Sequence, residues 1–307
     1  MKILSALIFL TLFFPAHKDL YAFTRHRHKI PAVVDTGGIS EKLKLESSIS
    51  DRVTWYQMFT NIPSDYNKFF LSSFTSQNFP KFVTFAALTG TLFFADQAGW
   101  QFNRNTYNRS KIIHKAADIA VIMGNGEYQF LGGALFAASG IVFHDETALK
   151  TGSNIAEAVI ATGLFVQLVK RITGRESPIV STERGGEWDF FPSIKEYQKH
   201  QPEFYSFPSG HLSTATAIFT VIANNYPDSK WIKPVGYSLL GVLGMSLVDK
   251  GMHWYSDLPF AYFLGYSFGN IIAPVKNTGT NKTDKNLLVV MPSVNYGGIQ
   301  LQLTYSF

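Results

Sequence analysis

The 307-residue sequence contains no cysteine, which excludes a disulfide framework and a zinc–thiolate site. It also has no block of consecutive lysines and arginines, although its net charge is +5, so we expect no nucleic-acid partner. Charged residues make up only 16% of the chain, which is low for an ordinary soluble protein. The positive charge therefore suits an anionic small molecule or an anionic membrane surface.

Apolar residues are plentiful, at 46% of the chain, and aromatic residues reach 15%. This composition excludes a disordered chain. The N-terminus has the pattern of a secretory signal peptide over residues 1–22, with Lys2 before an apolar stretch and small Ala22 at its end. A retained membrane anchor is the alternative. In either case we expect an exported protein, in the periplasm or in a membrane with its active site facing the exterior.

The remainder divides by composition. Residues 23–80 are mixed and polar, and we expect a collar of short helices and loops there. Residues 81–275 hold six apolar segments of helical length, separated by charged loops, which predict an all-α bundle of about six core helices. These segments are 82–95, 119–143 with a break near 124–126, 155–169, 209–223, 234–248 and 258–275.

Local signals refine this bundle. Asn154 with Glu157 resembles a capping box that would start the third helix. Ala261, Gly265 and Gly269 place small residues on one face of the sixth helix, which permits close helix packing. A membrane span needs about 20 apolar residues, and most segments are shorter. The sequence leaves open whether the bundle lies in lipid or in water.

The C-terminal part has a different pattern. Residues 276–286 form a polar linker rich in Thr, Asn and Lys. Residues 287–307 contain two apolar stretches around Asn295 and Gly298, and the second alternates strictly between apolar and polar residues. This predicts a β-hairpin, and we expect it to pack on the domain as an edge feature because one hairpin cannot close a barrel.

Three polar stretches lie at predicted helix ends, where chemistry is expected. The first runs from Lys170 to Pro178 and contains Arg175. The second is Pro208-Ser209-Gly210-His211. The third begins with Ser246-Leu247 and continues to His253 and Asp257.

The first two stretches suit a phosphate pocket. Lys170 and Arg175 offer cationic donors, and a guanidinium matches two phosphate oxygens at once. The turn at Ser209 and Gly210 leads into a helix, so its free N–H groups and its positive dipole end would face an anion. Gly210 has no side chain that would keep an anion away from the backbone.

The third stretch supplies the candidate nucleophile. Asp257 would accept a hydrogen bond from one nitrogen of His253 and leave the other nitrogen free to attack phosphorus. Asp257 also has the position of an N-cap for the sixth helix. His211 would protonate the leaving oxygen and later activate water.

Together these stretches resemble the three motifs of the type 2 phosphatidic acid phosphatase and vanadium haloperoxidase superfamily, over residues 82–275. The resemblance implies that Lys170 and Ser209 bind phosphate with the Gly210 amide. It implies His253 as the nucleophile, His211 as the acid and base, and Asp257 as the residue that orients His253.

Two positions depart from the family pattern. Ser177 and Leu247 stand where the first and third motifs have arginine. We expect Arg175 and Lys250 to replace these cations as phosphate ligands, because Arg175 is two residues from the first gap and Lys250 one helical turn beyond the second.

The sequence therefore predicts a phosphatase that needs no metal or other cofactor and hydrolyses a phosphate monoester through a phosphohistidine, with a lipid phosphate as the expected substrate. Three alternatives remain: a soluble periplasmic acid phosphatase, a vanadate-dependent haloperoxidase, and a non-catalytic relative with a degenerate pocket. The aromatic segment 179–207 would either cover the pocket or pack as an ordinary loop. The sequence does not indicate an oligomeric state.

Overall fold

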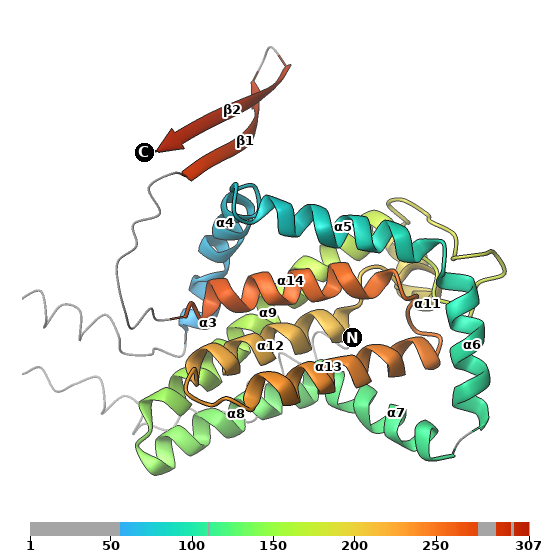
Figure 1. Cartoon of the computed structure of the whole chain (residues 1–307), viewed down its shortest axis with the longest axis horizontal. Helices are drawn as coiled ribbons and strands as arrows, with labels where there is room; N and C mark the ends of the chain where they lie inside the picture. Colours follow the sequence, from blue (N-terminus) through green and yellow to red (C-terminus); the bar gives the residue numbers. More distant parts are fainter. Residues whose placement is uncertain (1–55, 110, 276–286, 296–297, 307) are drawn as a thin grey trace, which may run out of the picture. The chain divides into compact units, whose positions relative to one another are not determined.

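The structure is a computed structural model that describes residues 56–109, 111–275, 287–295 and 298–306. The predicted signal peptide, the collar up to residue 55 and the linker 276–286 lie outside the described residues. The region predicted as the core is built of helices, which confirms the all-α class (Figure 1).

The described helices follow one another with short connections, apart from the long loop after α9. They are α3 (Gln57–Thr60), α4 (Ile62–Ser73), α5 (Phe79–Phe93), α6 (Asp96–Arg109), α7 (Lys111–Gly124), α8 (Gly126–Phe143), α9 (Glu146–Thr173), α10 (Ile194–Lys199), α11 (Gln201–Phe204), α12 (Gly210–Asn225), α13 (Ile232–Asp249) and α14 (Asp257–Ile272). Strands β1 (Leu287–Asn295) and β2 (Gly298–Ser306) pair antiparallel, with Leu287 opposite Ser306.

The helix boundaries differ from the sequence prediction at two places. Helix α6 was not predicted, because its sequence is polar and lacks an apolar run. Helix α9 begins at Glu146, where Asp145 is the N-cap and its Oδ1 accepts hydrogen bonds from the N–H groups of Thr147 and Ala148 at 2.8 and 3.1 Å. The predicted capping box at Asn154 and Glu157 is therefore wrong, since both residues lie inside α9.

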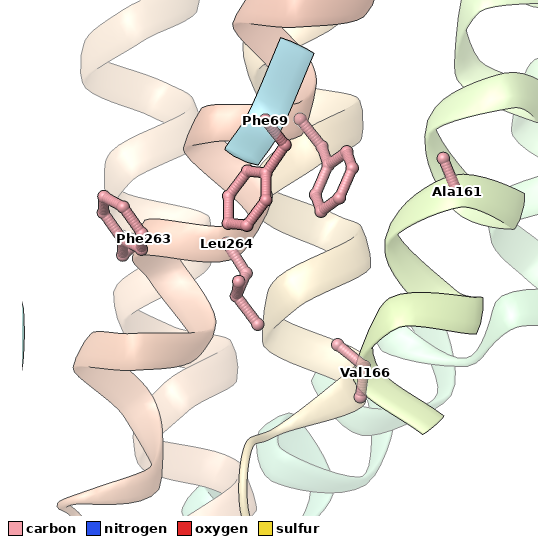
Figure 2. Packing of buried hydrophobic residues seen from close by; sticks show 6 residues of the cluster. Phe69, Ala161, Val166, Phe263 and Leu264 are labelled. Carbon is pink, nitrogen blue, oxygen red and sulfur yellow. The ribbon is translucent and has the colours of Figure 1, made fainter. Parts of the chain in front are cut away.

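Helices α9, α12 and α14 form the packed centre of the bundle, and α12 contacts both of the others (Figure 1). Figure 2 shows one buried cluster, in which Phe69 of α4 packs against Phe263 and Leu264 of α14 and reaches α9. The Phe69 and Phe268 rings stack with centres 4.9 Å apart. This cluster fixes α9 relative to α14, and both helices end or begin at a motif.

Glycines allow α14 to approach α12 closely. A Cβ on Gly265 would overlap the carbonyl oxygen of Ser213, and one on Gly269 would lie 2.5 Å from the Cβ of Thr220. The small residues noted in the sequence thus serve close helix packing. Because Ser213 is two residues beyond the second motif, this contact also sets the position of the start of α12 relative to α14.

Replacing Gly265 by alanine is expected to lower the free energy of unfolding by about 1–3 kcal/mol, because the added methyl group must push α12 and α14 apart. Chemical denaturation of the purified protein measures this. Gly241→Ala on α13 is the matched control, since a Cβ there meets nothing within 4 Å and alanine favours a helix. Equal stability of the two variants would contradict the close packing.

The outer helices carry large exposed apolar side chains. Ile112 of α7 is 82% exposed, Phe143 of α8 77%, and Leu135 of α8 63%. In the part of the chain that the structure describes, no helix combines the length and the apolar content that crossing a membrane requires.

Candidate active site

Lys170 lies in the last turn of α9, pointing into the protein. Its Nζ donates a hydrogen bond to the carbonyl oxygen of Tyr205 at 2.5 Å and lies 3.5 Å from the centre of the Tyr205 ring. The side chain is buried, and burial lowers the pKa of Lys170 to about 7 although the Asp257 charge opposes this. The ammonium is therefore close to losing its proton near neutral pH, and an anion would restore the charge.

The second motif brings the start of α12 next to Lys170. Ser209 is the N-cap of α12, and its Oγ accepts a hydrogen bond from the N–H of Leu212 at 3.4 Å. A Cβ on Gly210 would lie 4.0 Å from Nζ of Lys170. The first N–H groups of a helix have no acceptor within the helix, so the start of α12 and the Lys170 ammonium form one electropositive position.

The imidazole of His253 is held by a main-chain oxygen. Its Nδ1 lies 2.7 Å from the carbonyl oxygen of Ser206, while the nearest Asp257 oxygen is 3.7 Å away. A carbonyl only accepts, so Nδ1 carries the proton and Nε2 of the neutral ring has its lone pair free. Burial lowers the pKa of His253 and favours this neutral form. At 3.7 Å Asp257 does not make the short direct hydrogen bond expected from the sequence, and it acts on the imidazole through its charge and through Ser206.

Asp257 is the first residue of α14, and Ser256 is the N-cap, so the predicted N-cap role of Asp257 is wrong by one position. Its Oδ2 accepts from the Trp254 N–H at 2.7 Å and from the Ser206 hydroxyl at 2.5 Å. Burial alone would raise the pKa of Asp257, but the Arg175 charge, the adjacent His253 and the Ser206 hydroxyl outweigh it and lower the pKa to about 2. The carboxylate is thus ionised throughout the physiological range.

His211 is the more accessible histidine, since its side chain is half-buried whereas His253 is 1% exposed. Burial, the nearby His253 and the Lys170 charge lower the pKa of His211 to about 3. His211 is the second residue of α12, and its charge interactions with His253 and Lys170 indicate that all three side chains lie near the start of this helix. Without an anion His211 is neutral at pH 7, and a bound phosphate would raise its pKa and allow protonation.

Arg175 lies directly after α9 and is completely buried. Nη1 donates to Asp257 Oδ1 at 2.5 Å and to Ser256 Oγ at 2.7 Å, and Nη2 donates to Asp96 Oδ2 at 2.7 Å. Nε and Nη2 also donate to the carbonyl oxygen of Gly185, at 3.1 and 2.6 Å. All five N–H groups thus have protein acceptors, and this geometry does not support the phosphate-binding role predicted for Arg175.

Lys250 is the C-cap of α13, and its Nζ pairs with Asp118 of α7 at 2.5 Å. It lines a hollow of about 470 Å³ together with Trp100, Arg104 and Asp249, and neither Lys170 nor either motif histidine lines that hollow. The structure therefore does not bring Lys250 to the anion position through any of these contacts, and its predicted role as a replacement cation has no geometric support.

The two positions that lack the family arginines are both buried. Leu247 is 0% exposed and packs in a cluster with Leu212, Leu240 and Leu243. Ser177 is 4% exposed, and its N–H donates to the carbonyl oxygen of Pro202 at 2.8 Å. A packed leucine and a turn serine thus occupy these two positions, and of the three cations predicted to bind phosphate, Lys170 is the one whose Nζ lies near the start of α12.

Three further residues belong to the site and were not found from the sequence: Asp96, Ser206 and Ser256. Asp96 is 0% exposed and is the first residue of α6, and its Oδ1 accepts from the Ser256 N–H at 2.9 Å. Ser206 stands two residues before the second motif, and Ser256 directly before Asp257. In the sequence, the closeness of Ser206 and Ser256 to a motif was a weak indication that they belong to the site. No feature of the sequence indicated Asp96.

Residues 152–280 match the family model of the PAP2 superfamily, which covers all three motifs. This match supports, over these residues, the resemblance to the type 2 phosphatidic acid phosphatases that the three motifs indicate.

Two curated relatives are lipid A 1-phosphatases. The protein of Rhizobium etli is 31% identical over 119 residues, which is 38% of this chain and 45% of the relative. The protein of Rhizobium johnstonii is also 31% identical over 119 residues, 38% of this chain and 43% of the relative. This chain thus matches less than half the length of either relative. A solved transmembrane PAP2-type phosphatidylglycerolphosphate phosphatase from Bacillus subtilis has a TM-score of 0.45 and 16% identity, covering 62% of this chain and 91% of that one.

Proposed function

We propose that this protein hydrolyses a phosphate monoester of a lipid, through a phosphohistidine formed on His253. One observation carries the proposal: the Lys170 ammonium, the start of α12 and the imidazole of His253 are joined through the turn from Tyr205 to Gly210. A buried cation, a helix N-terminus and a neutral imidazole at one position suit the transfer of a phosphoryl group.

In the first step, Nε2 of His253 attacks phosphorus. The N–P bond forms while the bond from phosphorus to the ester oxygen breaks, and the leaving alkoxide takes a proton from His211. The Lys170 ammonium and the N–H groups at the start of α12 stabilise the equatorial oxygens in the transition state. The developing positive charge on the His253 ring is balanced by the ionised Asp257 through the Ser206 bridge.

In the second step, water attacks the phosphohistidine. His211 has lost its proton to the leaving group, so it now accepts a proton from this water. The N–P bond breaks, the electron pair returns to Nε2, and inorganic phosphate leaves. The cycle restores both histidines to their starting forms.

The exposed apolar surface supports a lipid as the substrate. Phe190 and Phe191, in the loop between α9 and α10, are 61% and 72% exposed. The Phe190 ring packs on Trp188, which contacts Phe207 beside the second motif. A mostly apolar hollow of about 320 Å³ lies between α7 and α13 and is lined by Val242 and Met245, among others. We propose that the protein acts at a membrane surface, on the exterior side.

A non-catalytic, anion-binding protein is the second candidate. The buried Leu247 and Ser177 favour it, because the two guanidinium groups of the family pattern are missing. The loss of such a group costs about 10²–10³ in kcat where nothing replaces it.

A phosphate-release assay tests the proposed function. Phosphatidic acid, a prenyl phosphate and a lipid A preparation in detergent micelles are compared with the soluble esters glucose 6-phosphate and p-nitrophenyl phosphate. We expect kcat/KM for at least one lipid phosphate to exceed that for the soluble esters by about 10²-fold, because remote apolar contacts contribute to transition-state binding. Equal values would indicate a soluble acid phosphatase. Sulfate binding without any turnover would indicate the anion-binding protein.

A further inference from the structure

We propose that Arg175, anchored by Asp96, is a positioning residue that holds the Ser256–Asp257 segment and thereby fixes the nucleophile His253. The proposal rests on the proposed function, because it assigns a role within that reaction. It differs from the phosphate-binding role that the sequence predicts for Arg175, and it adds a residue, Asp96, that lies outside the three motifs.

The guanidinium of Arg175 joins three segments of the chain. It contacts Asp96 at the start of α6, the Gly185 carbonyl in the loop after α9, and both Ser256 and Asp257 at the start of α14. Asp96 binds the same α14 segment independently, since its Oδ1 accepts from the Ser256 N–H at 2.9 Å and its Oδ2 from the Ser256 hydroxyl at 2.5 Å. Ser256 is therefore held by a cation and a carboxylate together.

This cluster is closed to solvent. Asp96, Arg175 and Asp257 are each 0% exposed. The aromatic rings of Trp188, Phe93 and Trp254 surround the guanidinium carbon, with ring centres 4.9, 5.2 and 5.5 Å away. Water cannot compete for the N–H groups, so the two ion pairs fix one geometry instead of exchanging partners as surface pairs do.

From Asp257 the constraint passes to the imidazole. Arg175 occupies Oδ1 of Asp257, which leaves Oδ2 for the Trp254 N–H and the Ser206 hydroxyl. The first of these contacts holds the backbone next to His253, and the second holds the residue whose carbonyl accepts from Nδ1 of His253. Arg175 therefore touches no reacting atom, and its effect on the reaction passes through Asp257 and Ser206.

Two variants test this role. Asp96→Asn keeps the shape and removes the charge, and Arg175→Lys keeps the charge and removes the planar set of donors. We expect each to lower kcat by about 30- to 100-fold, because a misplaced nucleophile loses its attack geometry. The affinity for sulfate, measured by calorimetry, should change less than threefold, since Lys170 and the start of α12 are untouched. Arg184→Lys and Asp228→Asn are exposed controls that should retain wild-type kcat.

The competing role gives the opposite pattern. If Arg175 binds phosphate, Arg175→Lys will weaken sulfate binding more than tenfold and Asp96→Asn will leave kcat unchanged; either result overturns the proposal. If Arg175→Lys does not fold, as judged by circular dichroism, Asp96→Asn alone decides. The double variant should have about the same kcat as the less active of the two single variants, because both substitutions break one network.

A readout independent of turnover separates this inference from the proposed function. Nitrogen-15 NMR of the histidine rings reports which nitrogen of His253 carries the proton. We expect the Nδ1–H form in the wild type and a mixture of tautomers in Asp96→Asn. An unchanged His253 signal in that variant refutes the positioning role even if the wild-type protein releases no phosphate. A wild type without turnover but with the expected NMR change would refute the proposed function alone.

Discussion

The His253→Ala variant is expected to release phosphate from a lipid substrate at least about 10⁴-fold more slowly than the wild type, because loss of a nucleophile removes the covalent route altogether. The same variant should form no phosphoenzyme. A rapid quench in alkaline detergent with a ³²P-labelled substrate measures this intermediate, and alkali is needed because acid hydrolyses the bond from nitrogen to phosphorus.

The control for this experiment is His200→Ala, since His200 is an exposed histidine whose ring pairs with the nearby Glu196 and Glu203. It should retain full turnover and full labelling. Labelling that persists in His253→Ala would place the phosphoryl group on another residue and would contradict the proposed mechanism. Sulfate binding to the variant should remain, which separates loss of the nucleophile from loss of the pocket.

The Lys170→Met variant is expected to bind sulfate about 10²-fold more weakly than the wild type at pH 6, because methionine fills the buried space without a charge. In the wild type the affinity should fall as pH rises above 7. The pKa of Lys170 is about 7 in the free protein, and a bound dianion raises it, so binding takes up a proton at higher pH. The fall approaches tenfold per pH unit.

Calorimetric titration with sodium sulfate between pH 6 and 9 measures both effects. Sulfate is chosen because its own charge stays constant over this range. Binding by Lys170→Met should be weak and should depend less on pH than binding by the wild type. Lys199→Met, an exposed lysine in α10, should titrate like the wild type. A wild-type affinity that is constant from pH 6 to 9 would show that Lys170 does not contact the anion.

The class of fold was predictable because it depends on local patterns. Apolar segments of helical length mark most of the bundle, and the break at Asn125 separates α7 from α8 as expected. Helix α6 was missed because its stability comes from tertiary contacts, such as those of Asp96, and not from an apolar stripe. The start of α9 was missed because Asp145 caps a helix whose first turns are polar.

The motif residues were predictable in identity but only partly in role. Lys170 and His253 both contact the chain just before the second motif, since each motif lies at a helix end. The partners of Arg175 could not be found in the same way. Asp96 lies 160 residues from Ser256, and Arg175 lies 82 residues from Asp257, so no spacing in the sequence connects them. The prediction for Arg175 considered its charge and its distance along the chain, but not the acceptors that fold around it.

The hold on the nucleophile by Ser206 has a consequence for how the site tolerates mutation. The group that accepts from Nδ1 belongs to the peptide backbone, and every amino acid at position 206 would supply it. Exchange of the side chain can weaken the link to Asp257, yet it cannot delete the acceptor that selects the tautomer. A substitution at position 206 would change the tautomer of His253 only if it moved the main-chain carbonyl away from Nδ1. The selection of this tautomer is therefore insensitive to the side chain at position 206 and sensitive to the position of the backbone.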